Sequence, residues 1–166
     1  MTPVTFLIYK IIGTIISHFF DLKYALIVEI VVDKDWRGSM GQLSILGFIA
    51  LGGAFGACAR YLVSEFCITL LGRGFPYGTL TVNFVGSFIM GLLVAAFESE
   101  MLATEPWRQI IGLGFLGALT TFSTFSMDNV LLIQQGAFFK MGLNILLNVV
   151  LSISAAWLGF QLLSKG

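Results

Sequence analysis

The sequence has 166 residues, of which 57% are hydrophobic and only 11% are charged, and its mean hydropathy is +0.94. Because a soluble domain carries about 25% charged residues, this composition predicts an integral membrane protein. The net charge of +0 argues against a nucleic-acid-binding surface, and one histidine (His18) with two cysteines (Cys58 and Cys67) is too few for a zinc site or a Ser/His or Cys/His nucleophile.

Residues 1–39 are predicted to form a separate N-terminal extension. Thr5–Phe20 is apolar, but Lys10 and His18 interrupt it, and it is shorter than the roughly 20 residues that a span needs. No small-residue cleavage site follows Phe20, which argues against a signal peptide. Two interpretations remain, an interfacial amphipathic segment or translated sequence upstream of the true start. Met40 stands directly before a membrane helix and favours the second, so we expect the main domain to be 40–166.

From Met40 onward the pattern is regular and predicts four membrane-spanning helices. The predicted spans are Leu43–Leu71, Thr79–Phe97, Ile110–Gln134 and Ala137–Leu163. Each span is long enough to cross a bilayer, and the short connections between them carry turn residues such as Gly and Pro. We therefore expect an all-α, multi-pass membrane protein whose functional groups lie inside the membrane.

The first span combines a small-residue face with a charge. Residues 52–57 hold two overlapping pairs of small residues four positions apart, which is typical of closely packed membrane helices. Arg60 follows in mid-span, where a charge costs at least ~3 kcal/mol. We expect Arg60 to have a functional or structural role by reaching carbonyl groups of a broken third helix; pairing with Glu65 or snorkelling to the surface are the alternatives. Cys58 and Cys67 fall on opposite helix faces and are expected to be reduced.

Asparagine and serine residues form polar stripes on the second and fourth spans. Asn83 lies four residues before Ser87, and Asn144, Asn148 and Ser152 repeat every four residues, so each set shares one helix face. Hydrogen bonding between helices is the ordinary role of such residues and is worth about 1 kcal/mol each. For Asn83 we predict an ion pathway instead, because polar groups within membranes cluster on such pathways. For Asn148 and Ser152 both roles remain open.

The third span contains a cluster of hydroxyl residues, TTFSTFS, at residues 120–126. Thr and Ser compete with the backbone for hydrogen bonds, and the neighbouring glycines add chain entropy, so the cluster weakens a helix. Irregular backbone at membrane depth is tolerated only where protein buries it or a water-filled cavity meets it. We therefore predict a break in the third helix whose freed carbonyl groups have a function.

Three stretches, taken in order, resemble the signatures of the Fluc (CrcB-type) fluoride ion channel family. They are GGAFGACARY at 52–61, GTLTVNFVGSF at 78–88 and GALTTFSTFS at 117–126. The resemblance covers residues 40–166 and leaves residues 1–39 outside. It implies a fluoride-specific ion channel in the cell inner membrane that exports fluoride passively from the cytoplasm and lowers its toxicity, and it implies no enzymatic activity.

The resemblance also implies an assembly and a set of site residues. Members of the family are antiparallel, dual-topology homodimers of four-helix subunits with a break in the third helix, two fluoride pores and a central structural sodium ion. The backbone carbonyls of Gly117 and Thr120, from both subunits, would hold the sodium ion, and Arg60 is the arginine of the first motif. The family often has Glu where this chain has Asp128, which leaves the contact there uncertain. The fluoride pathway is expected to comprise Asn83, Phe122, Phe125, Ser123, Thr124, Asn148 and Ser152.

The chemistry of these residues suits a small anion. Asn amides and Ser or Thr hydroxyls are neutral hydrogen-bond donors, which can replace water without trapping the anion as a fixed positive charge would. A phenyl ring has a positive edge, and Phe122 and Phe125, three residues apart, lie on one side of a helix. Burial in a core is the ordinary role of Phe, and the motif decides against it here. Backbone carbonyls are hard oxygen ligands, which suit sodium.

Two other classes of function are alternatives to a channel. A proton-coupled exporter of the small multidrug type needs a carboxylate at membrane depth in its binding cavity, and Asp128 is the only candidate near a motif. A non-transporting membrane scaffold leaves the placed polar residues unexplained. Membrane lipid, fluoride and a second copy of the chain are the expected partners.

Overall fold

The computed structural model describes residues 41–164, and the extension expected at residues 1–39 lies outside this range. Four long apolar helices can cross a membrane within the described residues: Gln42–Leu71, Tyr77–Glu98, Arg108–Gln134 and Phe138–Leu163. This confirms the predicted all-helical, multi-pass membrane architecture. The second helix begins two residues before the predicted Thr79, because it starts directly after Pro76, its N-cap residue.

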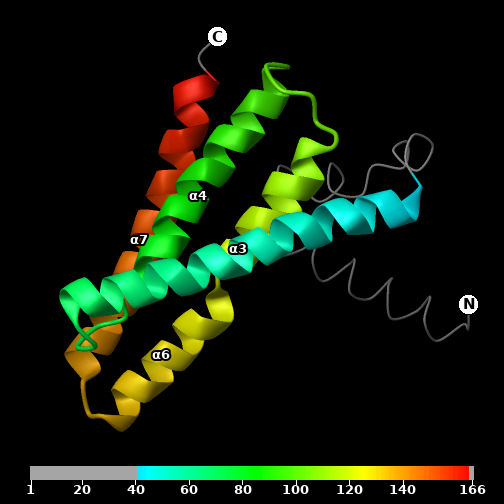
Figure 1. Ribbon diagram of the computed structural model, residues 1–166. Coiled ribbons are helices and arrows are strands. Elements are labelled where there is room, and N and C mark those ends of the chain that lie inside the picture. The colour runs from blue at the N-terminus through cyan, green and yellow to red at the C-terminus, as the bar shows by residue number, and fades with distance from the viewer. Residues whose placement is uncertain (1–40, 165–166) are drawn as a thin grey trace, which may run out of the picture. The chain divides into compact units, whose positions relative to one another are not determined.

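Three of these spans are single helices and one is composite (Figure 1). The first, second and fourth are α3 (Gln42–Leu71), α4 (Tyr77–Glu98) and α7 (Phe138–Leu163). The third consists of a π-helix, η2 (Arg108–Leu116), the single turn α5 (Gly117–Leu119) and α6 (Phe122–Gln134). A π-helix was not predicted, because hydropathy shows only that the segment is apolar.

Glycines with positive φ close two of the helices. Gly72 has φ +76° and donates its N–H to the Ile68 carbonyl at 2.9 Å, which ends α3. Gly136 has φ +70° and donates to the Ile133 carbonyl at 2.9 Å after α6. A left-handed residue at this position satisfies carbonyl groups that the helix leaves free, and only Gly adopts the conformation without strain.

Other glycines let the helices touch backbone to backbone. A Cβ at Gly91 of α4 would overlap the Ala156 carbonyl of α7, and one at Gly159 of α7 would overlap the Phe88 carbonyl of α4. Figure 1 shows these two helices side by side. Close approach at small residues replaces the hydrophobic effect as the source of helix association in a membrane.

The small-residue face of α3 packs against η2. A Cβ at Gly52 would overlap the Ile110 carbonyl, and one at Gly56 would overlap the Phe115 carbonyl. The predicted packing face is therefore confirmed for these two glycines. Gly53 points elsewhere, since a Cβ there would meet only the Gly114 carbonyl, at 4.0 Å.

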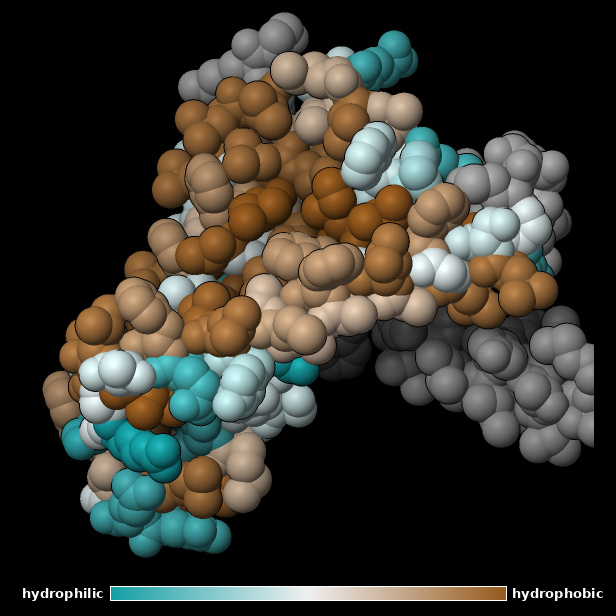
Figure 2. All heavy atoms as spheres, in the orientation of Figure 1, coloured by the Kyte–Doolittle hydropathy of each residue, from teal (hydrophilic) through white to brown (hydrophobic). Residues whose placement is uncertain are grey.

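The outer surface is apolar, as a membrane protein requires. Figure 2 shows hydrophobic residues over most of the visible helical surface, with hydrophilic residues gathered around the α3–α4 and α6–α7 connections. Lys140, in the first turn of α7, contacts the α3–α4 connection, because its Nζ donates to the Gly74 carbonyl at 2.8 Å. The buried apolar cluster is small and consists of Val82, Leu93, Leu116 and Leu119.

Candidate functional site

Two extended residues separate α5 from α6. Thr120 has φ −76° and ψ 154°, and Thr121 has φ −153° and ψ 115°, so the helical path stops after Leu119 and resumes at Phe122. The Thr121 side chain caps the new helix, because its Oγ1 accepts the Thr124 N–H at 3.1 Å. A hydroxyl at the N-cap satisfies a donor that a helix start leaves free.

Asn83 of α4 binds both backbone groups of Thr121. Its Oδ1 accepts the Thr121 N–H at 2.8 Å, and its Nδ2 donates to the Thr121 carbonyl at 3.2 Å. In a continuous helix the Thr121 N–H would instead bond to the carbonyl of Gly117. The Asn83 side chain therefore takes over the hydrogen bonds that the extended residues cannot make within a helix.

Asn83 is also the first member of a row of four hydrogen-bonded asparagines. Its Nδ2 donates to Asn148 Oδ1 at 3.0 Å, and Asn148 Nδ2 donates to Asn144 Oδ1 at 2.8 Å. Asn144 Nδ2 donates to Asn129 Oδ1 at 3.1 Å, and Asn129 Nδ2 donates to the Phe125 carbonyl at 2.8 Å. Asn129, Asn144 and Asn148 are all buried. We call this row, from Asn83 to Asn129, the amide chain.

A groove of about 440 Å³ brings most of the predicted pathway residues together. Ser152 lines it with a buried Oγ to which no group within residues 41–164 hydrogen-bonds. The groove thus pairs aromatic rings with neutral donors. Its lining includes Asn83, Ser87, Thr120, Thr121, Phe122, Phe125, Asn148 and Ser152.

The two phenylalanines of the groove differ in exposure. Their ring centroids are 5.4 Å apart and the rings are tilted by 51°. Phe125 is buried at 8% exposure, whereas Phe122 is 78% exposed. The structure therefore places both rings on one side, as their spacing predicts, but only Phe125 belongs to the packed interior of the subunit.

The remaining predicted residues lie outside this groove. Ser123 and Thr124 are exposed, and their hydroxyls lie 3.2 and 3.0 Å from Thr121 Oγ1. Arg60 is half-buried and lines another cavity, of about 280 Å³, with Thr121 and Thr124. The choice between a role of Arg60 at the third span and pairing with Glu65 stays a prediction.

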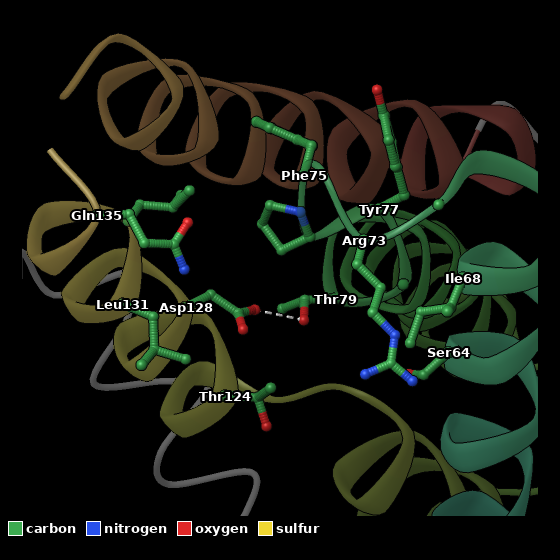
Figure 3. Close-up of a pocket in the computed structure, with 14 residues that line it drawn as sticks. Ser64, Ile68, Arg73, Phe75, Tyr77, Thr79, Thr124, Asp128, Leu131 and Gln135 are labelled. Atoms are coloured by element: carbon green, nitrogen blue, oxygen red, sulfur yellow. Dashed lines mark hydrogen bonds between the residues drawn. The ribbon is translucent and has the colours of Figure 1, made fainter. Parts of the chain in front are cut away.

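A third cavity, of about 290 Å³, contains the one carboxylate of the third span (Figure 3). Asp128 Oδ2 accepts a hydrogen bond from Thr79 Oγ1 at 2.7 Å, and Ser64, Arg73 and Thr124 also line the cavity. The shorter side chain of Asp128 therefore still reaches α4. Thr79 was not predicted as its partner, because the two residues are 49 positions apart in the sequence.

The extended residues also leave carbonyl groups without their helical donors. The Thr121 N–H, which would serve Gly117, goes to Asn83, and the Thr124 N–H, which would serve Thr120, goes to Thr121 Oγ1. Gly117 is exposed and Thr120 half-exposed. Within residues 41–164 no cluster of three or more His, Cys, Asp or Glu side chains could hold a metal ion.

Comparison with known proteins gives a consistent set of relatives. The family described as CrcB-like protein, Camphor Resistance (CrcB), matches residues 47–160. The chain is 88% identical over 126 residues to a Vibrio parahaemolyticus protein named fluoride-specific ion channel FluC, covering 76% of this chain and 99% of that protein. A protein of the same name from Vibrio vulnificus is 87% identical over 126 residues, covering 76% of this chain and 100% of that protein. One from Photobacterium profundum is 68% identical over 126 residues, covering 76% of this chain and 99% of that protein.

Proposed function

Because the chain belongs to the CrcB-like protein family, we propose that it forms a fluoride-specific ion channel that exports fluoride passively from the cytoplasm. Fluoride enters cells as neutral HF and is trapped as the anion in a less acidic cytoplasm, so a passive exit suffices. The observation that carries this proposal is the groove that joins Asn83 to Phe122, Phe125 and Ser152. Such a channel is not an enzyme, and the cell inner membrane is its expected location.

The groove offers an anion neutral donors without a fixed charge. The Ser152 hydroxyl is buried and unbonded within the described residues, so it is free to donate. The Asn83 amide donates to the Thr121 carbonyl and to Asn148 Oδ1, and fluoride would take the place of one of these acceptors. The longer of the two bonds, to Thr121 at 3.2 Å, is the weaker and the one we expect to be exchanged.

The aromatic rings supply the second half of the coordination. The edges of Phe122 and Phe125 carry partial positive charge, which attracts an anion weakly enough to let it leave. Ser123, Thr124 and Arg60 lie beside the groove and would guide the anion to or from it. Because Phe122 is 78% exposed in the single subunit, a second subunit packed on this face would complete the pathway.

We infer that this second subunit is antiparallel and that a sodium ion lies between the two. The carbonyls of Gly117 and Thr120, which lack their helical donors, fit such an ion, since sodium prefers hard, uncharged oxygen ligands. Bound sodium would neutralise the carbonyl dipoles and hold the two extended segments together.

Efflux of fluoride from liposomes, followed with a fluoride electrode, tests the function. The purified protein should release fluoride and not chloride, without a proton gradient. Release that requires a proton gradient would indicate the exporter, and no release would indicate the scaffold. The exporter is disfavoured because Asp128, its only candidate carboxylate, bonds to Thr79 in a cavity other than the groove.

Asn83→Asp should abolish efflux while leaving the dimer assembled. The new carboxylate can still accept the Thr121 N–H, but its second oxygen would face the Thr121 carbonyl and Asn148 Oδ1, two acceptors. It would also repel the anion. Efflux is compared at equal amounts of dimer, counted by gel filtration, and near-normal efflux from an intact dimer would remove Asn83 from the pathway.

Replacing sodium by a bulky organic cation during purification and reconstitution should lower both efflux and the melting temperature of the dimer. An ion that binds only the folded assembly stabilises it by mass action. Potassium salts serve as the control for ionic strength. An unchanged melting temperature and full efflux without sodium would mean that the Gly117 and Thr120 carbonyls hold no such ion.

A further inference from the structure

Asn129 is the member of the amide chain that lies neither in a motif nor in one of the polar stripes of the sequence. It lies on α6 and is buried, with 8% of its surface exposed. Its Oδ1 accepts from Asn144 Nδ2 at 3.1 Å, and its Nδ2 donates to the Phe125 carbonyl at 2.8 Å. Both functions of its amide are therefore used, one toward α7 and one toward its own helix.

The amide chain begins and ends on the same short segment. At one end the Thr121 N–H donates to Asn83, and at the other Asn129 donates to the Phe125 carbonyl. Between these backbone groups the hydrogen bonds pass through α4, α7 and α6. The chain is thus a closed circuit around the beginning of α6, where the extended residues meet the groove.

The two backbone ends give the circuit a single direction. An N–H group can only donate and a carbonyl can only accept, whereas an Asn amide presents an oxygen on one edge and an NH₂ on the other. Turning any one amide by 180° would set donor against donor or acceptor against acceptor on both its sides. Inside a protein such an unpaired polar group is costly, so each amide holds its neighbours in place.

We propose that Asn129 is a positioning residue for the fluoride pathway, which rests on the channel function proposed above. By accepting from Asn144, Asn129 keeps the Asn144 oxygen turned toward Asn148 Nδ2. The Asn148 oxygen is then left to hold the Asn83 donor. Asn129 does not line the groove, and its hydrogen bond to Phe125 is to the backbone carbonyl, so its effect on the groove would pass through the other amides.

Asn129→Leu tests this proposal, because it keeps the side-chain size and removes both hydrogen bonds. Asn144 then loses its partner on α6 and becomes free to turn, which would set its NH₂ group against Asn148 Nδ2 and leave that nitrogen only the Asn144 backbone carbonyl, at 3.1 Å. We expect fluoride efflux per dimer to fall about tenfold, the effect of one lost hydrogen bond at the pathway. Ser126→Ala is the matched control. Ser126 lies on the same helix and donates to the Phe122 carbonyl at 2.9 Å, but it takes no part in the circuit. Its efflux should stay within about twofold of the unsubstituted protein.

The melting temperature separates positioning from a merely structural role. A structural role predicts a lower melting temperature with unchanged efflux per dimer, and that result would overturn the proposal. If Asn129→Leu fails to fold, fluoride efflux from Asn129→Ser tests the positioning role in its place. Its hydroxyl can still donate to the Phe125 carbonyl, as Ser126 does to Phe122, but it is too short to accept from Asn144. Normal efflux from Asn129→Ser would also overturn the proposal, whereas absence of efflux from the unsubstituted protein would overturn the channel function with it.

Discussion

Phe122 and Phe125 show that two residues of one motif can have different energetic roles. Their rings lie 5.4 Å apart beside the same groove, yet Phe125 is buried and Phe122 is exposed in the subunit. A buried ring contributes packing energy to the subunit. An exposed ring contributes less to that packing, here through its contact with Phe125, and its open side can meet a second subunit or an ion. Substitution of each ring can therefore distinguish stability from transport.

Phe125→Ile should lower the free energy of unfolding by about 1–3 kcal/mol, whereas Phe122→Ile should change it by no more than about 0.5 kcal/mol. Both changes should reduce fluoride efflux, because an aliphatic side chain has no positive ring edge. Thermal unfolding and electrode-detected efflux are measured together. Phe139→Ile, at a residue of α7 that is 83% exposed and outside the groove, should alter neither. Normal efflux from Phe122→Ile would mean that the Phe122 ring contacts lipid and not the anion.

Sequence spacing predicts local neighbours better than distant ones. The four-residue repeat placed Asn144 and Asn148 on one face, and their side chains are hydrogen-bonded. The bond from Asn83 to Thr121 joins residues 38 positions apart, which no periodicity encodes. Asn129 was missed although it stands four residues after Phe125, because a polar residue late in a span is also typical of the membrane interface.

At the scale of elements, the third span is the one whose secondary structure differs from the continuous helix that its hydropathy predicts. Its apolar length predicts one continuous helix, and the hydroxyl cluster predicts a weak point at residues 120–126. The extended residues are Thr120 and Thr121, at the start of that cluster. The π-helix before them, η2, has no comparable signal in the sequence.

Gly52→Ala should disrupt the packing of α3 against η2, since the new Cβ would overlap the Ile110 carbonyl. Overpacking of this kind costs about 1–3 kcal/mol. Gly53→Ala is the matched control, because its Cβ would lie 4.0 Å from the nearest atom, the Gly114 carbonyl oxygen. The yield of folded protein and the melting temperature in detergent should fall for Gly52→Ala alone. Equal behaviour of the two variants would mean that the contact between α3 and η2 is not close in the membrane.

At the scale of the whole molecule, the charge distribution of the sequence agrees with insertion in both orientations. Counting from Met40, the amino end, second connection and carboxyl end hold Arg108 and Lys165, and the first and third connections hold Arg73 and Lys140. Each side therefore carries two basic residues, so the positive-inside rule favours neither orientation. Adding Lys34 and Arg37, the two basic residues of the extension nearest the first span, would change the balance to four against two if the extension stays on the amino side.

Single-cysteine labelling at the carboxyl terminus, in a background that lacks Cys58 and Cys67, should therefore detect that terminus on both sides of the membrane. Cys58 is exposed and Cys67 buried, so Cys58 in particular must be removed to avoid background labelling. The same labelling of a protein that starts at Met40 serves as the comparison. Labelling from one side only, in both proteins and in intact cells, would contradict the antiparallel dimer and the shared sodium ion.

The glycine contacts between α4 and α7 also determine how the protein responds to bilayers of different thickness. A membrane helix adapts to a thicker or thinner bilayer by changing its tilt. Gly91 and Gly159 bring the two backbones into direct contact, so neither helix can tilt without the other. Asn83 lies on α4 and Asn148 on α7, and the distance between them is therefore preserved when the pair tilts. We therefore expect fluoride efflux to depend little on bilayer thickness.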